Sequence, residues 1–232
     1  MTGERQLRVF SELQIWAHKH LIHFTAAFLL TGLILVGGET FRVLGEILGY
    51  PIAEVFAPEY DAYSAGVQVA RWIHRLSALG LAFVLVPFFF AEIFRAAKWE
   101  FWPECWSLEC FKQGLRNMID YYLGRGRPEF GKYNLGQKCW IWLASIGMVI
   151  MYITGIIMWF RDSFSVTVWE YAHLIHVIGF YLSIIFLAIH VYLATMIPEH
   201  RPMVTAMFRT GTVPEEFAKE HHPRWYEKVR KS

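Results

Sequence analysis

Cysteine and charged residues are scarce in this sequence of 232 residues. The chain has 3 cysteines, too few and too badly spaced for a zinc site or a disulfide framework, so we expect them to be structural. Charged residues make up 18% of the chain, whereas soluble domains carry about 25%. The formal net charge of +2 gives no reason to expect nucleic-acid binding.

Four stretches contain no Asp, Glu, Lys or Arg at all, namely residues 20–38, 76–91, 139–160 and 171–198. A helix that spans a bilayer needs about 20 mostly apolar residues and satisfies its own backbone. The sequence therefore predicts an all-α membrane protein, a bundle of four transmembrane helices near residues 17–38, 71–94, 139–160 and 171–197. Residues 39–70 and 95–138 are read as connections. This pattern excludes a cytosolic globule and a disordered chain.

The positions of Lys and Arg predict the orientation of these helices. Of the 22 basic residues, 18 lie in the N-terminal segment, the 95–138 connection and the C-terminal tail. The positive-inside rule then places both termini and that connection in the cytoplasm. Residues 1–19 are polar and no small-residue cleavage site follows, so we expect the first span to be retained. Residues 1–200 would form the membrane domain and 201–232 a cytoplasmic tail, which is either a docking surface or a solvated segment.

Histidines are unusually frequent inside these spans. Seven of the 10 histidines lie in or at the ends of predicted spans: His18, His20, His23, His74, His173, His176 and His190. Ionisable groups in a bilayer are costly and normally face the interior of the bundle. A lone one is more often a hydrogen-bond donor between helices than a metal ligand. The repeated pattern favours ligands here.

The spacing of the histidines predicts two sites. His176 and His190 are separated by close to four helical turns, so they share a face about 21 Å apart along the axis. The predicted topology pairs His74 with His176 at the outer level and His18 with His190 at the inner level. Facing imidazole pairs suit porphyrin iron in an electron-transfer role, whereas structural zinc needs four protein ligands. Spacing alone leaves His20 open as an alternative to His18.

Other residues near these histidines fit a flat cofactor or ordinary helix packing equally well. Glycines let a cofactor or a helix approach the backbone, and aromatic side chains would line a cofactor or face lipid. These residues are Gly32, Gly80, Gly155, Gly179, Phe24, Phe28, Trp140, Trp142 and Phe180. Arg75 would neutralise a haem propionate or extend toward the membrane interface.

Several motifs together resemble one family. They are Phe10-Ser11-x-x-Gln14-x-x-x-His18 with Thr31-Gly32, Ala70-Arg71-x-x-His74-Arg75, Gly131-Lys132-Tyr133-Asn134-Leu135-Gly136-Gln137-Lys138, Leu174-Ile175-His176, Ile189-His190-Val191-Tyr192 and His221-His222-Pro223-Arg224-Trp225-Tyr226. They resemble the membrane cytochrome b subunit, or gamma subunit, of respiratory formate dehydrogenases, which is grouped with di-haem cytochromes of hydrogenases and thiosulfate reductases. The first motif selects His18 over His20. Ile15 and Lys19 depart from the family pattern, which often has Arg and Trp there.

The resemblance implies a function and a set of site residues. His18, His74, His176 and His190 would bind two b haems, and Asn134, Gly136 and Gln137 would form a quinone pocket near His190. Amide side chains suit a quinone carbonyl because they donate hydrogen bonds without a fixed charge. The alternative is that Asn134 only caps the third span.

The resemblance also implies partners and a location. An iron–sulfur (beta) subunit would supply electrons from a molybdenum or tungsten catalytic (alpha) subunit. The two haems would pass them to menaquinone or ubiquinone in the inner membrane. The equivalent subunit of a hydrogenase or a thiosulfate or polysulfide reductase is the nearest alternative. A haem-free anchor or a histidine-lined transporter is an alternative from another class, although no pair of interrupted spans favours transport.

Overall fold

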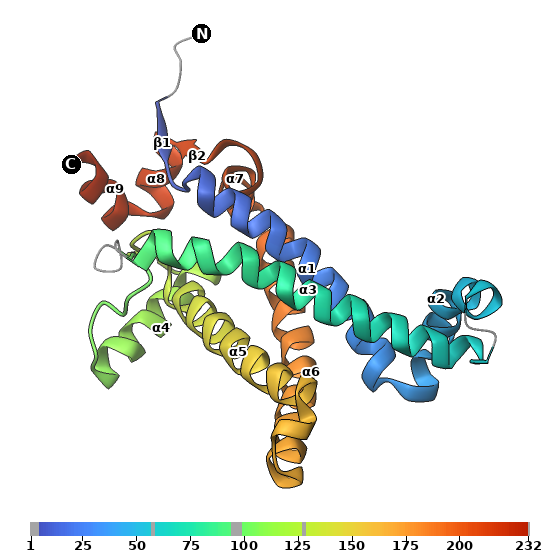
Figure 1. Cartoon of the computed structure of the whole chain (residues 1–232). Helices are drawn as coiled ribbons and strands as arrows, with labels where there is room; N and C mark the ends of the chain where they lie inside the picture. The colour runs from blue at the N-terminus through green and yellow to red at the C-terminus, as the bar shows by residue number, and fades with distance from the viewer. Residues whose placement is uncertain (1–4, 57–58, 94–98, 127–128, 232) are drawn as a thin grey trace. The chain divides into compact units, whose positions relative to one another are not determined.

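The computed structural model describes residues 5–56, 59–93, 99–126 and 129–231. Within them, four helices are long and apolar enough to cross a membrane: α1 (Glu12–Val36), α3 (Ala62–Ile93), α5 (Leu135–Trp159) and α6 (Val166–Met196) (Figure 1). The predicted all-α membrane fold with four spanning helices is confirmed. At 1.5 Å per residue even a helix of 25 residues, such as α1, is about 37 Å long and exceeds the roughly 30 Å hydrocarbon core.

The surfaces of these helices are apolar on the outside. Phe83 is 84% exposed, Leu30 57% and Ile185 55%, which is the pattern of side chains that contact lipid. The buried positions on the same helices include small and hydroxyl residues, namely Ala65, Ala70, Ala172, Thr31, Ser77 and Thr154. Membrane helices commonly meet through such residues, because small side chains let the backbones approach.

All four of these helices begin earlier than predicted, and polar caps explain the early starts of α3 and α6. The Asp61 carboxylate accepts hydrogen bonds from the backbone N–H groups of Tyr63 at 3.0 Å and Ser64 at 3.1 Å, so α3 begins at Ala62. The Ser165 hydroxyl accepts one from Val168 N–H at 3.3 Å, so α6 begins at Val166. The prediction began near charge-free residues and therefore omitted the polar first turns that such caps stabilise.

Two further helices lie in the segments that the sequence analysis read as connections. They are α2 (Arg42–Val55) and α4 (Leu108–Tyr122). The α2 helix packs against α3 without side chains between the backbones, since a Cβ atom on Gly66 would lie 1.8 Å from the Gly45 carbonyl oxygen. The α4 helix is capped by the Ser107 hydroxyl, which accepts a hydrogen bond from Cys110 N–H at 3.2 Å. The two predicted connections thus each contain a helix within their described residues.

The C-terminal tail folds onto the N-terminal segment. Strand β1 (Gln6–Arg8) pairs antiparallel with β2 (Thr212–Pro214), with Leu7 opposite Val213. This small ribbon is the one departure from an all-α chain in the described residues. The remaining tail elements are η4 (Pro198–His200), α7 (Arg201–Thr205), a π-helical turn (Ala206–Thr210), α8 (Glu215–His221) and α9 (Pro223–Arg230).

A hydrophobic cluster holds the tail together. It contains Leu7, Val9, Phe10, Ile15, Ala206, Val213, Ala218 and Trp225. Gly211, at φ +69°, makes the turn into β2, and its carbonyl accepts hydrogen bonds from Val9 and Phe10 N–H. This cluster packs the tail against the N-terminal segment.

The chain divides into two compact units. Unit 1 contains Met1–Ile15, Glu92–Ile153 and His190–Ser232, and unit 2 contains Trp16–Ala91 and Thr154–Ile189. Each of the four long helices contributes residues to both units. The tail, α4 and the start of α5 belong to unit 1, whereas α2 belongs to unit 2.

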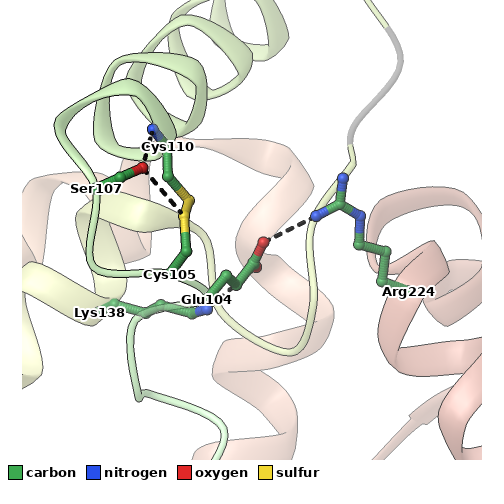
Figure 2. The surroundings of a disulfide bond; sticks show 6 residues. All are labelled: Glu104, Cys105, Ser107, Cys110, Lys138 and Arg224. Atoms are coloured by element: carbon green, nitrogen blue, oxygen red, sulfur yellow. Dashed lines mark hydrogen bonds and ion pairs between the residues drawn. A yellow bond between two sulfur atoms is a disulfide. The ribbon is translucent and has the colours of Figure 1, made fainter.

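One disulfide among the described residues lies in unit 1 and joins the segment before α4 to the first turn of that helix. It joins Cys105 to Cys110, and Figure 2 shows it beside Glu104. The Glu104 carboxylate accepts hydrogen bonds from Lys138 Nζ at 3.2 Å and Arg224 Nη1 at 2.8 Å, so it links α5 to α9. The cysteine count did not predict this pair. Cys139 is a free, exposed thiol.

We predict that Trp225→Ala destabilises the tail. Trp225 is 5% exposed within the cluster, and replacing a buried Trp by Ala costs about 3–5 kcal/mol. The melting temperature of the protein in detergent, followed by circular dichroism, should fall. Trp106→Ala is the matched control because Trp106 is 85% exposed. Equal melting temperatures for the two variants would contradict a packed tail.

Candidate functional site

Two of the predicted ligands meet in unit 2. The ring of His74 on α3 lies 6.2 Å from the ring of His176 on α6, measured between ring centroids, with the planes inclined by 61°. The two residues are far apart in the sequence, and the helical topology alone predicted that they lie at one level. The structure brings this pair together.

A threonine fixes the protonation pattern of His74. Thr31 Oγ1 lies 2.7 Å from the Ala27 carbonyl oxygen and 2.8 Å from His74 Nδ1. A carbonyl can only accept, so the single hydroxyl proton of Thr31 is donated to Ala27. Thr31 Oγ1 then accepts from His74 Nδ1–H. In neutral imidazole the other nitrogen, Nε2, carries the lone pair that binds metals.

His176 has a partner of the same kind. Thr154 Oγ1 lies 2.8 Å from His176 Nδ1. A ligating histidine commonly uses its second ring nitrogen to hold a hydrogen bond, which sets the orientation of the ring. Both rings therefore have the environment of ligands that coordinate through Nε2.

The separation of the two rings fits one metal ion. Metal–nitrogen bonds of about 2 Å to each of two imidazoles separate their centroids by roughly 6 Å, and the observed distance is 6.2 Å. No group of three or more His, Cys, Asp or Glu is placed to hold a metal among the described residues. Two protein ligands do not make a structural zinc site, but they fit an iron whose other four positions a porphyrin fills.

The residues around the pair are aromatic or lack a side chain. The Phe28 ring lies 5.0 Å from the His74 ring, and a Cβ atom on Gly155 would lie 3.5 Å from His176 Cε1. Gly32 and Gly80 face aromatic rings instead: their Cβ atoms would lie 2.4 Å from Phe180 and 2.7 Å from Phe24. These two glycines therefore serve close packing of side chains in the structure.

Arg75 lies beside the pair but forms no ion pair among the interactions of the described residues. Its guanidinium lies over the rings of Trp72 at 5.7 Å and Trp159 at 5.1 Å from their centroids. Cation–π contacts of this kind hold the cation near the membrane surface without an acidic partner. The positive charge is thus available for an anionic group.

His18 and His190, the other predicted pair, belong to different units. His190 lies in unit 1, where its ring stacks on Trp140 with centroids 4.8 Å apart and planes 7° from parallel. His18 lies on α1 in unit 2 and is half-buried. Trp140 is therefore one of the predicted aromatic residues that does lie beside a predicted ligand.

The remaining intramembrane histidines have local contacts. His20 Nδ1 lies 2.8 Å from the Trp16 carbonyl oxygen of its own helix, and its ring packs on Trp16 at 4.4 Å. His173 stacks on Trp169 at 5.3 Å and is exposed. His23 is exposed and lies at 6.3 Å from His20 between ring centroids. The hydrogen bond of His20 engages Nδ1 and leaves Nε2 free, so these contacts do not decide between His18 and His20 as a ligand.

Asn134 and Gln137 form a reciprocal cap at the start of α5. Asn134 Oδ1 accepts a hydrogen bond from Gln137 N–H, and Gln137 Oε1 accepts one from Asn134 N–H, each at 2.9 Å. The capping role that was considered for Asn134 is therefore present. Because both side-chain oxygens are engaged, the NH₂ groups are the parts of both amides that point away from the backbone. Gly136 has no space for a side chain, since its Cβ atom would lie 2.9 Å from Met118 Sδ.

A small cavity lies against this cap in unit 1. Asn134, Gln137, Glu199, His200 and His222 are among the residues that line it, and its volume is about 20 Å³. That volume holds about one water molecule. A quinone ring would need this region to open.

Sequence reasoning missed several residues that contact the predicted ones. Thr31 stood in a quoted motif without a role, and Thr154 was not singled out. Tyr122 belongs to no motif or regular spacing in the sequence. Its hydroxyl nevertheless lies 3.2 Å from Asn134 Nδ2 and 3.2 Å from His200 Nε2. Only the fold brings these residues together.

Comparisons with known proteins show which family the chain resembles. A family model described as prokaryotic cytochrome b561 matches residues 21–210. The formate dehydrogenase cytochrome b556 subunit of Haemophilus influenzae is 30% identical over 191 residues, which cover 80% of this chain and 68% of the relative.

Two relatives from Escherichia coli K12 match over shorter stretches. The cytochrome b556(fdo) subunit of formate dehydrogenase is 38% identical over 105 residues, 44% of this chain and 48% of the relative. The nitrate-inducible cytochrome b556(Fdn) subunit is 34% identical over 123 residues, 51% of this chain and 55% of the relative. The chain thus spans about half the length of these two relatives.

We predict that the buried His222, which lines this cavity, makes the stability of the protein depend on pH. Burial lowers the pKa of His222 from 6.5 to about 4, although its Nδ1–H donates to the Gly131 carbonyl at 3.1 Å. Between pH 6.5 and 4 the unfolded chain therefore binds a proton that the folded chain excludes. Stability is full above pH 6.5 and falls with decreasing pH, by up to about 1.4 kcal/mol per pH unit. Chemical unfolding from pH 4 to 8 measures this slope, and His222→Asn should reduce it; an unchanged slope would refute the assignment.

Proposed function

Because the chain belongs to the prokaryotic cytochrome b561 family, we propose that it is the membrane cytochrome b subunit of a formate dehydrogenase complex. Membership of this family implies an integral membrane protein that carries haem b. The chain passes electrons from an iron–sulfur subunit through two b haems to a quinone. The observation that carries this proposal is the His74–His176 pair with a threonine on each Nδ1 atom.

The first haem lies between His74 and His176. Each ring holds its Nδ1 atom against a threonine hydroxyl, so both would coordinate iron through Nε2. A haem held by these two histidines would supply one-electron transfer rather than binding of a gas ligand. The guanidinium of Arg75 would pair with a propionate of this haem, since Arg matches a carboxylate with two parallel hydrogen bonds.

The second haem is held by His18 and His190. His190 follows His176 by close to four helical turns on α6. It therefore lies on the same helix face as His176, which is paired with His74. The stacked Trp140 ring supports His190 because it restricts the orientation of the imidazole. The motif Phe10-Ser11-x-x-Gln14-x-x-x-His18 favours His18 over His20 for this role.

The quinone is reduced beside Asn134, Gly136 and Gln137. The reciprocal cap directs the side-chain oxygens of Asn134 and Gln137 toward backbone N–H groups, which leaves the NH₂ groups as donors. A quinone carbonyl only accepts hydrogen bonds, so it is matched to these donors. Gly136 keeps the segment close to Met118. Menaquinone or ubiquinone is the substrate, and the cavity expands to admit the ring.

The complex lies in the inner membrane with both termini of this chain in the cytoplasm. The distribution of Lys and Arg supports this orientation. The relatives are named as subunits of formate dehydrogenases, which supports the presence of other subunits. We propose that these are an iron–sulfur subunit and a molybdenum or tungsten catalytic subunit. Formate is oxidised on that catalytic subunit and not on this chain.

We predict that each haem depends on its own histidine pair. His74→Ala and His190→Ala should each lower the haem content by about half, because each removes one of the two ligands of one of the two haems. Haem content is measured from the reduced-minus-oxidised spectrum of the purified protein. His20→Ala and His173→Ala are the controls and should retain the full spectrum. A full-strength spectrum after His74→Ala or His190→Ala would disprove the ligand assignment.

We predict that Gln137→Ala slows quinone reduction roughly tenfold while both haems remain bound, since loss of one hydrogen bond to a substrate carbonyl costs about 1.4 kcal/mol. Dithionite-reduced protein is mixed with decylubiquinone or a short-tailed menaquinone analogue, and haem oxidation is followed optically. A surface variant of the same type, Gln113→Ala on exposed α4, is the control. Unchanged rates for Gln137→Ala would remove this residue from the quinone site.

A further inference from the structure

A chain of hydrogen bonds leads away from the proposed quinone site in unit 1. Asn134 Nδ2 lies 3.2 Å from the Tyr122 hydroxyl at the end of α4, and this hydroxyl lies 3.2 Å from His200 Nε2 in η4. His200 Nδ1 in turn lies 2.6 Å from the Leu193 carbonyl oxygen. Three elements that are distant in sequence thus contribute one continuous polar path.

The donor and acceptor of each hydrogen bond in this path can be assigned, because the roles of the groups at both ends are fixed. The Leu193 carbonyl can only accept, so His200 Nδ1 carries a proton and, in the neutral ring, Nε2 accepts. The Tyr122 hydroxyl therefore donates to His200. At the other end, Asn134 Oδ1 accepts from Gln137 N–H, so Asn134 Nδ2 is the group that donates to the Tyr122 oxygen.

The far end of the path reaches water. His200 is half-buried, its neighbour Glu199 is exposed, and both line the cavity that holds about one water molecule. Burial raises the pKa of Tyr122, so its hydroxyl keeps its proton at neutral pH and remains a donor. The path therefore joins the solvent to the amide that binds the quinone carbonyl.

We propose that Tyr122 and His200 form the proton-delivery path to the quinone, with Asn134 as the residue that positions Tyr122. This inference rests on the proposed quinone site. Each quinone takes two electrons, supplied by haem, and two protons to form the hydroquinone. For each proton, the Tyr122 O–H bond breaks as a new O–H bond forms on the quinone oxygen. Before this transfer, water protonates His200 at Nε2, so the Tyr122 oxygen accepts from Nε2–H and its own proton is released from His200. As Tyr122 protonates the quinone, the Nε2–H bond breaks and its proton passes to the Tyr122 oxygen, which leaves His200 neutral until water protonates it again.

The neighbouring Tyr121 provides a matched control. Tyr121 lines the same cavity, but its hydroxyl lies 2.8 Å from His221 Nδ1 and makes no hydrogen bond to Asn134 or His200 among those of the described residues. Tyr121→Phe and Tyr122→Phe each remove one hydroxyl from adjacent positions of α4. A merely structural role for these hydroxyls would make the two variants alike.

The test uses the full chain in detergent with both haems bound. Dithionite-reduced protein is mixed with decylubiquinone or a short-tailed menaquinone analogue, and the saturating rate and half-saturating concentration are measured in H₂O and D₂O. We expect Tyr122→Phe and His200→Gln to lower the saturating rate at least tenfold, because general acid catalysis contributes about 10²–10⁴-fold and water replaces part of it. Both variants should show a larger solvent isotope effect than the parent protein. The half-saturating concentration, quinone binding by tryptophan fluorescence and the haem spectrum should not change.

Rates within twofold of the parent protein for either variant, with both haems bound, would overturn the proposal, as would an equal loss in Tyr121→Phe. If Tyr122→Phe loses haem, His200→Gln alone decides, because it keeps a polar side chain in η4. The Gln137→Ala variant separates the two proposals. A slow Gln137→Ala with normal Tyr122→Phe and His200→Gln rejects only the proton path, whereas normal rates in all three reject the quinone site as well.

Discussion

The hydrogen bond between threonine and histidine is the interaction on which the chemistry of the membrane helices depends. An imidazole in an apolar span is costly unless its polar atoms are satisfied. Thr31 satisfies one nitrogen of His74 and Thr154 one nitrogen of His176, and both contacts involve Nδ1. Because Thr31 also donates to its own helix backbone, it can only accept from His74. A small hydroxyl residue thus sets which ring nitrogen is available for iron, while its size lets the helices pack closely.

The polar chemistry outside the spans is organised by the start of α5. The cap formed by Asn134 and Gln137 begins a membrane helix and, with the same atoms, orients two amide groups. One of these amides contacts Tyr122. Helix capping and substrate recognition therefore do not compete here, since the cap uses the oxygens and leaves the nitrogens. This explains why either reading of Asn134 is reasonable from the sequence.

The spans and the pairing of His74 with His176 could be predicted because each follows from a regular repeat. Charge-free stretches locate helices, and a fixed rise per residue converts spacing into depth. The caps at Asp61 and Ser165 could not be placed, since a polar residue before a span is equally compatible with a loop. The contact between Tyr122 and His200 depends on how α4 and η4 fold, and no local pattern encodes it. The disulfide between Cys105 and Cys110 was missed for the same reason.

The ribbon formed by β1 and β2 has a consequence for how the chain behaves when cut. Leu7 and Val213, near opposite ends of the sequence, are paired in the ribbon and buried in one cluster with Trp225. A protease that cleaves between Pro198 and Gly211 would leave the C-terminal fragment bound to residues of the N-terminal segment. The nicked protein would elute as one species in gel filtration under native conditions. It would separate into two bands only on a denaturing gel.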